Sequence, residues 1–87
     1  MSPERAEILG LEALSWLVSE PAGIERFLVA SGVEAADLRE AAGSPGLAVA
    51  IIDFLLAHED LLLNFCESSG TAAASLHSAR RALDPES

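Results

Sequence analysis

Hydrophobic positions in this chain recur every three to four residues, a spacing typical of amphipathic helices. Residues 3–19 show the pattern most fully. Their apolar face is expected to pack inward with these residues: Ala6, Leu9, Gly10, Ala13, Trp16 and Leu17, widened by Leu11, Leu14 and Val18. β-branched and aromatic residues are sparse and tyrosine is absent, so the chain holds little strand-forming material. The pattern therefore predicts an all-α fold.

Start and stop signals divide the chain into about six short helices. Ser-Pro pairs at Ser2 and Ser44 are expected to open two of them, since serine caps a helix and proline suits its first turn. Gly32, Gly43 and Gly70 are expected stops, and Thr71 is the expected cap of the last helix. We predict helices over about 3–19, 21–31, 34–42, 45–57, 59–69 and 72–83.

An internal repeat relates the two halves of the chain. Residues 27–41 match residues 65–79 at an offset of 38, with seven identities in fifteen positions. The same offset places Trp16 on Phe54. We expect a compact bundle of two pseudo-repeated three-helix units, about 3–42 and 45–83, related by an approximate two-fold within one domain over 1–87. The high alanine content leaves coincidence as the alternative. The expected core contains four aromatic residues: Trp16, Phe27, Phe54 and Phe65.

Segment 45–57 is the most apolar, which predicts a central helix. Asp53 is its only charged residue. A carboxylate in such a helix lies either on a narrow exposed strip or in the interior beside an arginine. In the first case, Asp53 shares the exposed strip with Gly46, Ala50 and Ala57. In the second case, Arg26 or Arg39 is its expected partner.

Charge narrows the classes of partner. Fourteen acidic residues face five arginines and no lysine, giving a net charge of −9. Such a surface repels phosphate backbones and anionic headgroups, so we expect neither nucleic acid nor a membrane as partner. The start of the chain lacks a basic segment followed by an apolar one, and Cys66 is the single cysteine. A cytoplasmic location is expected.

Candidate chemistry is limited to the region of His58, Glu59 and Cys66. Adjacent helical residues point about 100° apart, so His58 and Glu59 cannot chelate one ion together. Cys66 is expected to behave as a small buried hydrophobe. We expect no enzyme activity and no cofactor. The alternative is a small metal-dependent or catalytic protein that uses these three residues.

Excess apolar residues suggest an interaction surface. Residues 61–63 are three consecutive leucines, which span about 200° of a helix and cannot all face inward. We expect an exposed patch near the fourth and fifth helices, and such patches often mark interfaces. The expected function is a non-catalytic acidic interaction or adaptor protein, with a purely structural homodimer as the alternative. The surface comprises Val49, Asp53, Leu56, Leu61 and Leu63.

Four stretches of the chain resemble a small bacterial family of unknown function, found mainly in alphaproteobacteria. They are ALSWL at 13–17, RFLVASGVEAADLREAAGSP at 26–45, IIDFLLAHEDLLLNFC at 51–66 and SARRAL at 78–83. The resemblance covers nearly the whole chain and implies a stand-alone, cytoplasmic, all-helical protein. It supplies no activity. The chain departs from the family at Thr71-Ala72-Ala73, where the family has an Asp-Pro type of helix opening.

Overall fold

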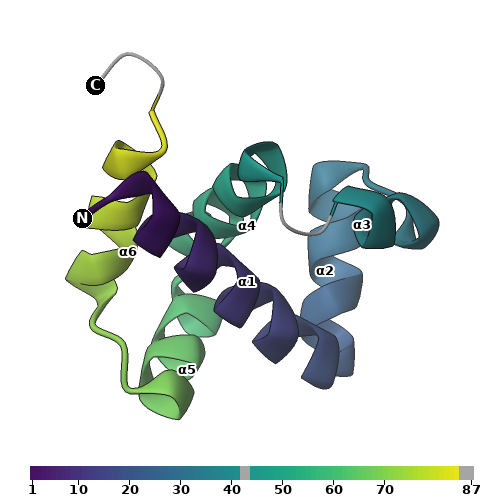
Figure 1. The fold of residues 1–87 in the computed structure, drawn as a ribbon. Helices are drawn as coiled ribbons and strands as arrows, with labels where there is room; N and C mark the ends of the chain where they lie inside the picture. Colours follow the sequence, from purple (N-terminus) through teal and green to yellow (C-terminus); the bar gives the residue numbers. More distant parts are fainter. Residues whose placement is uncertain (42–43, 85–87) are drawn as a thin grey trace.

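The computed structural model describes residues 1–41 and 44–84, and these residues form six helices and no strand (Figure 1). The all-α prediction is confirmed. The predicted stop at Gly43 and the end of the predicted segment 34–42 lie outside the described residues. The helices are α1 (Pro3–Ser19), α2 (Pro21–Ser31), α3 (Ala35–Ala41), α4 (Pro45–Ala57), α5 (Glu59–Ser69) and α6 (Ala73–Ala82).

Predicted capping residues explain four helix ends. The hydroxyl of Ser2 accepts a hydrogen bond from the backbone N–H group of Arg5, and the hydroxyl of Ser44 accepts one from the backbone N–H group of Leu47, both at 3.2 Å. Each bond satisfies a backbone donor that the first turn leaves without a partner. Gly32 and Gly70 end α2 and α5 with φ of 73° and 74°, a left-handed conformation that only glycine adopts without strain.

The prediction for Thr71 is wrong. Ala72 takes the N-cap position of α6 in an extended conformation, and its side chain makes no capping bond. The backbone N–H of Thr71 instead donates to the hydroxyl of Ser69, at 3.3 Å. Since this turn with Ser69 and Gly70 holds Thr71 next to the end of α5, the residue lies one position too early to cap α6.

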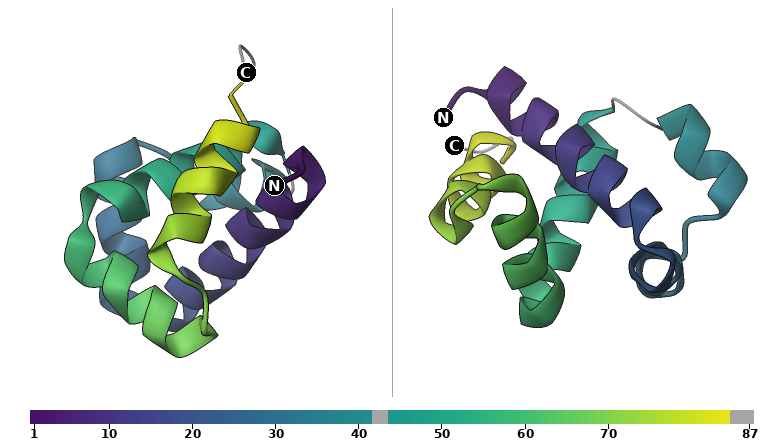
Figure 2. Two further views of the ribbon diagram at one scale, coloured as in Figure 1. Left: turned by 90° about the vertical axis from the view of Figure 1, so that its left-hand side faces the viewer. Right: turned by 90° about the horizontal axis from the view of Figure 1, so that it is seen from below.

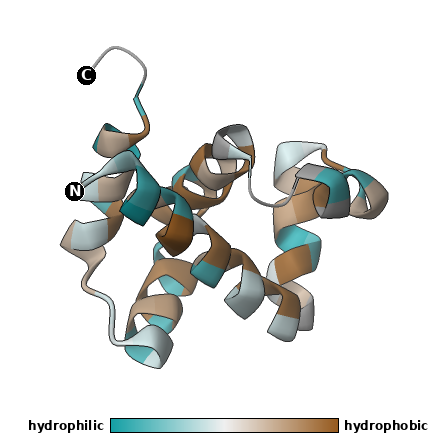
Figure 3. Cartoon of the chain, in the orientation of Figure 1, coloured by the Kyte–Doolittle hydropathy of each residue, from teal (hydrophilic) through white to brown (hydrophobic). Residues whose placement is uncertain are grey.

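Helix α4 lies at the centre of the molecule and packs against all five other helices. Helices α5 and α6 lie on one side of it, and α2 and α3 on the other (Figure 1 and Figure 2). Figure 3 shows that much of α4 is hydrophobic. The central position is therefore confirmed, and it explains the apolar composition: five neighbours bury Leu47, Ala48, Ile51, Ile52, Phe54 and Leu55.

Helices α1 and α4 cross closely at Gly10. A Cβ atom added there would lie 2.7 Å from the Cβ atom of Ala48 and 3.0 Å from its Cα atom. Real Cβ contacts are longer, so the crossing requires glycine on one helix and a small residue on the other. Small side chains thus set how near the first helix lies to the centre of the fold.

Aromatic side chains join the two predicted units. Trp16 of α1 meets Phe65 of α5 edge to face, with ring centroids 5.7 Å apart. Phe27 of α2 meets Phe54 of α4 in the same way at 5.3 Å. The three phenylalanines are buried as expected, whereas Trp16 is only half-buried against them. Edge-to-face contacts of this kind add stability beyond the area they bury.

The repeat matches local structure better than overall packing. Helices α2 and α5 begin and end 38 residues apart, and α3 and α6 begin 38 residues apart. The same offset relates Trp16 to Phe54 and Phe27 to Phe65, so it converts one aromatic contact into the other. However, α6 packs against α1, α4 and α5, while α3 packs mainly against α4. A two-fold relation between whole three-helix units therefore stays a prediction.

Candidate interaction surfaces

The structure reduces the predicted surface on α4 and α5. Leu61 is buried, so its expected exposure is wrong. The side of α5 that faces the interior carries Leu61, Leu62 and Phe65. Leu63 points the other way and is 54% exposed. Two of the three leucines therefore fit on the inner face, and the third alone remains available to a partner.

The other predicted surface residues lie on α4. Val49 and Leu56 are half-buried, and Leu56 packs against the hydrophobic core. Asp53 is exposed, and the Nε–H group of Arg80 donates to its Oδ1 atom at 2.7 Å. The two side chains are 52% and 36% exposed, so this is a surface ion pair between α4 and α6. The exposed-strip alternative for Asp53 is confirmed.

Arg26, one of the two arginines proposed as a partner for a buried Asp53, does not pair with it in the structure. Arg26 instead pairs with Asp60, with an N–O distance of 2.8 Å. The hydrogen bond from Arg26 lowers the pKa of the Asp60 carboxyl, since it stabilises the charged form. The side chain of Arg39 lies outside the described residues.

His58 joins α4 to α5, as the end of one helix and the start of the next. Its Nδ1 atom lies 2.8 Å from the carbonyl oxygen of Phe54, and its ring lies against the Phe54 ring with centroids 4.3 Å apart. The imidazole also borders two shallow depressions beside α2, of about 490 and 420 Å³. These contacts give His58 a structural role at the helix junction.

The structure does not assemble His58, Glu59 and Cys66 into a reactive group. No hydrogen bond among the described residues links the three. Burial raises the pKa of the Cys66 thiol, whereas a cysteine nucleophile needs a lowered pKa. In residues 1–41 and 44–84, no group of three or more His, Cys, Asp or Glu side chains could hold a metal ion.

Helix α1 carries half of the large hydrophobic residues that are exposed in the described part of the chain. The exposed large hydrophobic residues of the described part are Met1, Ile8, Leu11, Val18, Val29 and Leu63. Three of them, Ile8, Leu11 and Val18, lie within an arc of about 80° on α1. We name these three the outer stripe of α1; they are 47%, 44% and 58% exposed.

The inward placement expected for Leu11 and Val18 is therefore wrong. The opposite side of α1 already fills the contact with α4 and α6, through Ala6, Leu9, Gly10, Ala13 and Leu17. Helix α1 carries more apolar residues than one buried face can hold. A sequence signal was available, because positions 8, 11 and 18 form a second helical series separate from the buried one.

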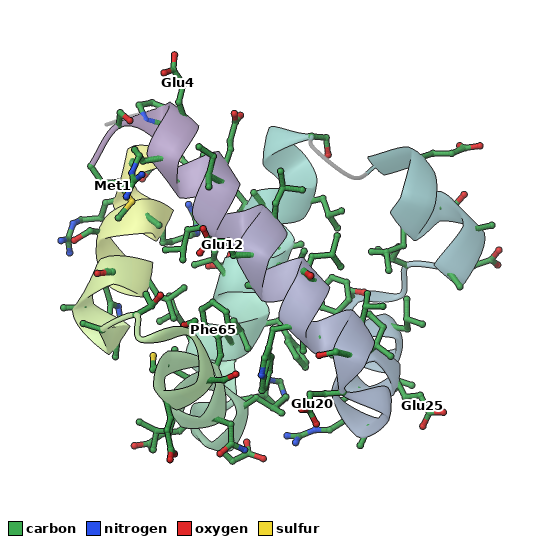
Figure 4. The ribbon with its side chains drawn as sticks, turned by 60° about the horizontal axis from the view of Figure 1, so that its bottom comes forward. Met1, Glu4, Glu12, Glu20, Glu25 and Phe65 are labelled. Carbon is green, nitrogen blue, oxygen red and sulfur yellow. The ribbon has the colours of Figure 1, made fainter. Side chains whose placement is uncertain are left out.

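Carboxylates surround the outer stripe. Figure 4 shows Glu4 at the start of α1, Glu12 near its middle and Glu20 just after its end. Glu7 and Leu11 line a narrow depression beside α4, and Ile8 and Glu12 line one of about 380 Å³ beside the connection from α5 to α6. Arg5 is the one basic residue of this helix. The α1 surface thus combines an apolar centre with an acidic border.

Comparison with family models matches residues 3–86 to a family described as a protein of unknown function, DUF3572. The chain belongs to the DUF3572 family. The match includes all six helices of this DUF3572 protein, and it confirms the predicted membership of a family of unknown function. No curated protein and no solved structure matches the chain.

Within residues 1–41 and 44–84, none of the helices has the length and apolar character required to span a bilayer. The surfaces that stand out are the outer stripe of α1 with its acidic border and the isolated Leu63 on α5.

Proposed function

We propose that this protein is a non-catalytic, acidic helical module that binds another protein as an adaptor. One observation carries the proposal: a row of large apolar side chains stays exposed on α1 in a small, strongly acidic domain. Exposing such groups to water is unfavourable, and contiguous exposed apolar surface is typical of interaction sites. The net charge of −9 favours a basic partner over an acidic one.

Several features support this function over the enzymatic alternative. Burial raises the pKa of the Cys66 thiol, and the imidazole of His58 contacts the carbonyl oxygen and the ring of Phe54. We accordingly propose that the protein acts without a cofactor. The acidic surface and the single cysteine suit a cytoplasmic setting, which is part of the proposal.

Leu63 gives the proposal a second surface. It is exposed on α5, and Asp53, Val49 and Leu56 are the remaining members of the predicted α4–α5 surface. An adaptor could bind its protein partner through this second surface. A homodimer could use the same surface to contact a second copy of the chain.

Affinity capture from native cells tests the proposed function. The tagged wild type is captured in parallel with two surface variants, Leu63→Asp and the double variant Leu11→Ser with Val18→Ser. Ala74→Asp, which adds a charge at an exposed position of α6, is the control. We expect a stoichiometric partner that the wild type and the control retain and that at least one surface variant loses. Failure to recover any partner, or a metal bound to the purified protein in native mass spectrometry, would contradict the proposal.

A further inference from the structure

We infer that the outer stripe of α1 is the docking site for a basic amphipathic helix of a partner protein. The inference rests on the proposed interaction function and names its surface and its partner class. Its basis is the juxtaposition of Ile8, Leu11 and Val18 with carboxylates on both sides of the same helix.

The shape of the stripe suits a helix of about three turns. Ile8 and Val18 are ten residues apart, about 15 Å along the helix axis. Leu11 lies one turn from Ile8 and two turns from Val18, and all three side chains point to the same side of the helix. A partner helix presents its own apolar residues at spacings of three, four and seven, which match such a row. The depression of about 380 Å³ beside Ile8 provides space for such a side chain on one side of the stripe.

Charge selects the partner. Glu4, Glu7 and Glu12 lie on α1 and Glu20 lies just after its end, while Arg5 is the one basic residue of the helix. Lysines or arginines bordering the apolar face of a partner helix would meet these carboxylates, which fixes its orientation and speeds its association. The same carboxylates repel phosphate groups of nucleic acids and anionic lipids.

A second copy of the chain is a poor match for this surface. In a symmetric dimer each α1 would present the same acidic border to the other. The border supplies only Arg5 as a compensating base, so most carboxylates would lie near others or near apolar groups. The stripe itself is apolar enough to bind, but the charges around it require a basic counterpart.

Binding of synthetic peptides tests the inference directly. The probe is a helical peptide of about 18 leucines and lysines, with leucines at i, i+3, i+4 and i+7. A scrambled peptide of equal composition and a leucine–glutamate version serve as peptide controls. Fluorescence anisotropy is measured with the wild type and the Leu11→Ser and Val18→Ser double variant. Val29→Ser and Leu63→Ser each remove another exposed apolar side chain and serve as matched controls.

We expect the amphipathic basic peptide to bind the wild type more tightly than either control peptide. The double variant should weaken binding at least about tenfold, a change of about 1.4 kcal/mol, while each control variant stays within about twofold. Glu7→Gln with Glu12→Gln should weaken binding and reduce its dependence on salt between about 50 and 500 mM. Circular dichroism melts establish that each variant is folded.

The inference is overturned if the scrambled peptide binds equally well, or if the stripe variant and the Val29→Ser control behave alike. It is also overturned if light scattering shows a wild-type dimer that the stripe variant makes monomeric. A cellular partner lost with Leu63→Asp but retained by the stripe variant would refute this docking site while supporting the proposed interaction function.

Discussion

At the scale of single residues, one missing side chain determines how α1 and α4 meet. A methyl group at Gly10 would lie 2.7 Å from the Cβ atom of Ala48, deep between two helices. By contrast, a methyl group at Gly46 would meet nothing within 4 Å. These two glycines therefore differ in what they do, although both lie inside helices.

We expect Gly10→Ala to lower the free energy of unfolding by about 1–3 kcal/mol, because the helices must move apart to admit the new methyl group. Gly46→Ala is the matched control and should leave stability unchanged or raise it by up to about 1 kcal/mol, since alanine favours the helix. Urea unfolding measures both. Equal stability of the two variants would refute the tight crossing.

The thiol of Cys66 should react slowly at neutral pH. Burial raises its pKa, so less of it is thiolate than in an unfolded cysteine peptide. The rate of alkylation should be below that of the peptide at pH 7 and should rise as pH increases through the raised pKa. Because the unfolded chain loses this proton first, stability should fall above the ordinary cysteine pKa. A rate above that of the peptide would instead favour the catalytic alternative.

At the scale of elements, local capping signals in the sequence correctly predict four helix ends. Ser2, Ser44, Gly32 and Gly70 act through bonds to nearby backbone, so their effect can be predicted from neighbouring residues alone. The signal at Thr71 is misleading because the preceding Ser-Gly turn binds the backbone of that residue. Such competition depends on the exact residue at which α5 ends.

The N-terminus of α6 can be improved. Ala72 has the extended conformation of an N-cap but no side chain that accepts a hydrogen bond. Ala72→Ser should therefore raise the free energy of unfolding by about 0.5–2 kcal/mol. Ala74→Ser, an exposed position two residues later within the helix, is the control and should be neutral or slightly destabilising. No gain from Ala72→Ser in thermal melts would contradict this helix start.

The interaction surface is harder to predict than the fold. Helical periodicity distinguishes opposite faces of an isolated helix, but it does not say which face its neighbours cover. Leu61 and Leu63 are two residues apart, and only the positions of α4 and α6 decide that one is buried and the other exposed. Likewise, Leu11 and Val18 belong to one apolar series on α1 and Leu9 and Leu17 to another, and the neighbouring helices decide that the second series is the buried one.

At the scale of the whole molecule, excess negative charge opposes compaction. The net charge is −9, and the ion pairs Arg26–Asp60 and Arg80–Asp53 both lie on the surface. Exposed pairs contribute little, so repulsion among the remaining carboxylates should dominate the response to salt.

We expect the melting temperature to rise as sodium chloride increases from about 20 to about 500 mM, since salt screens repulsion between exposed charges. Differential scanning calorimetry at pH 7 measures the change, with urea unfolding as an independent measure. Sodium sulfate at equal ionic strength separates screening from general salt effects. A melting temperature that falls with salt would mean that the ion pairs outweigh the repulsion.

The close crossing of α1 and α4 has an evolutionary consequence. Gly10 and Ala48 are 38 residues apart, so corresponding positions of the repeat touch each other and share room for one methyl group between them. If the halves arose by duplication, neither position could enlarge without its counterpart shrinking. Exchanging the pair, Gly10→Ala with Ala48→Gly, keeps the composition and should recover most of the stability that Gly10→Ala alone removes. Evolution could thus place alanine at position 10 or at position 48, but not at both.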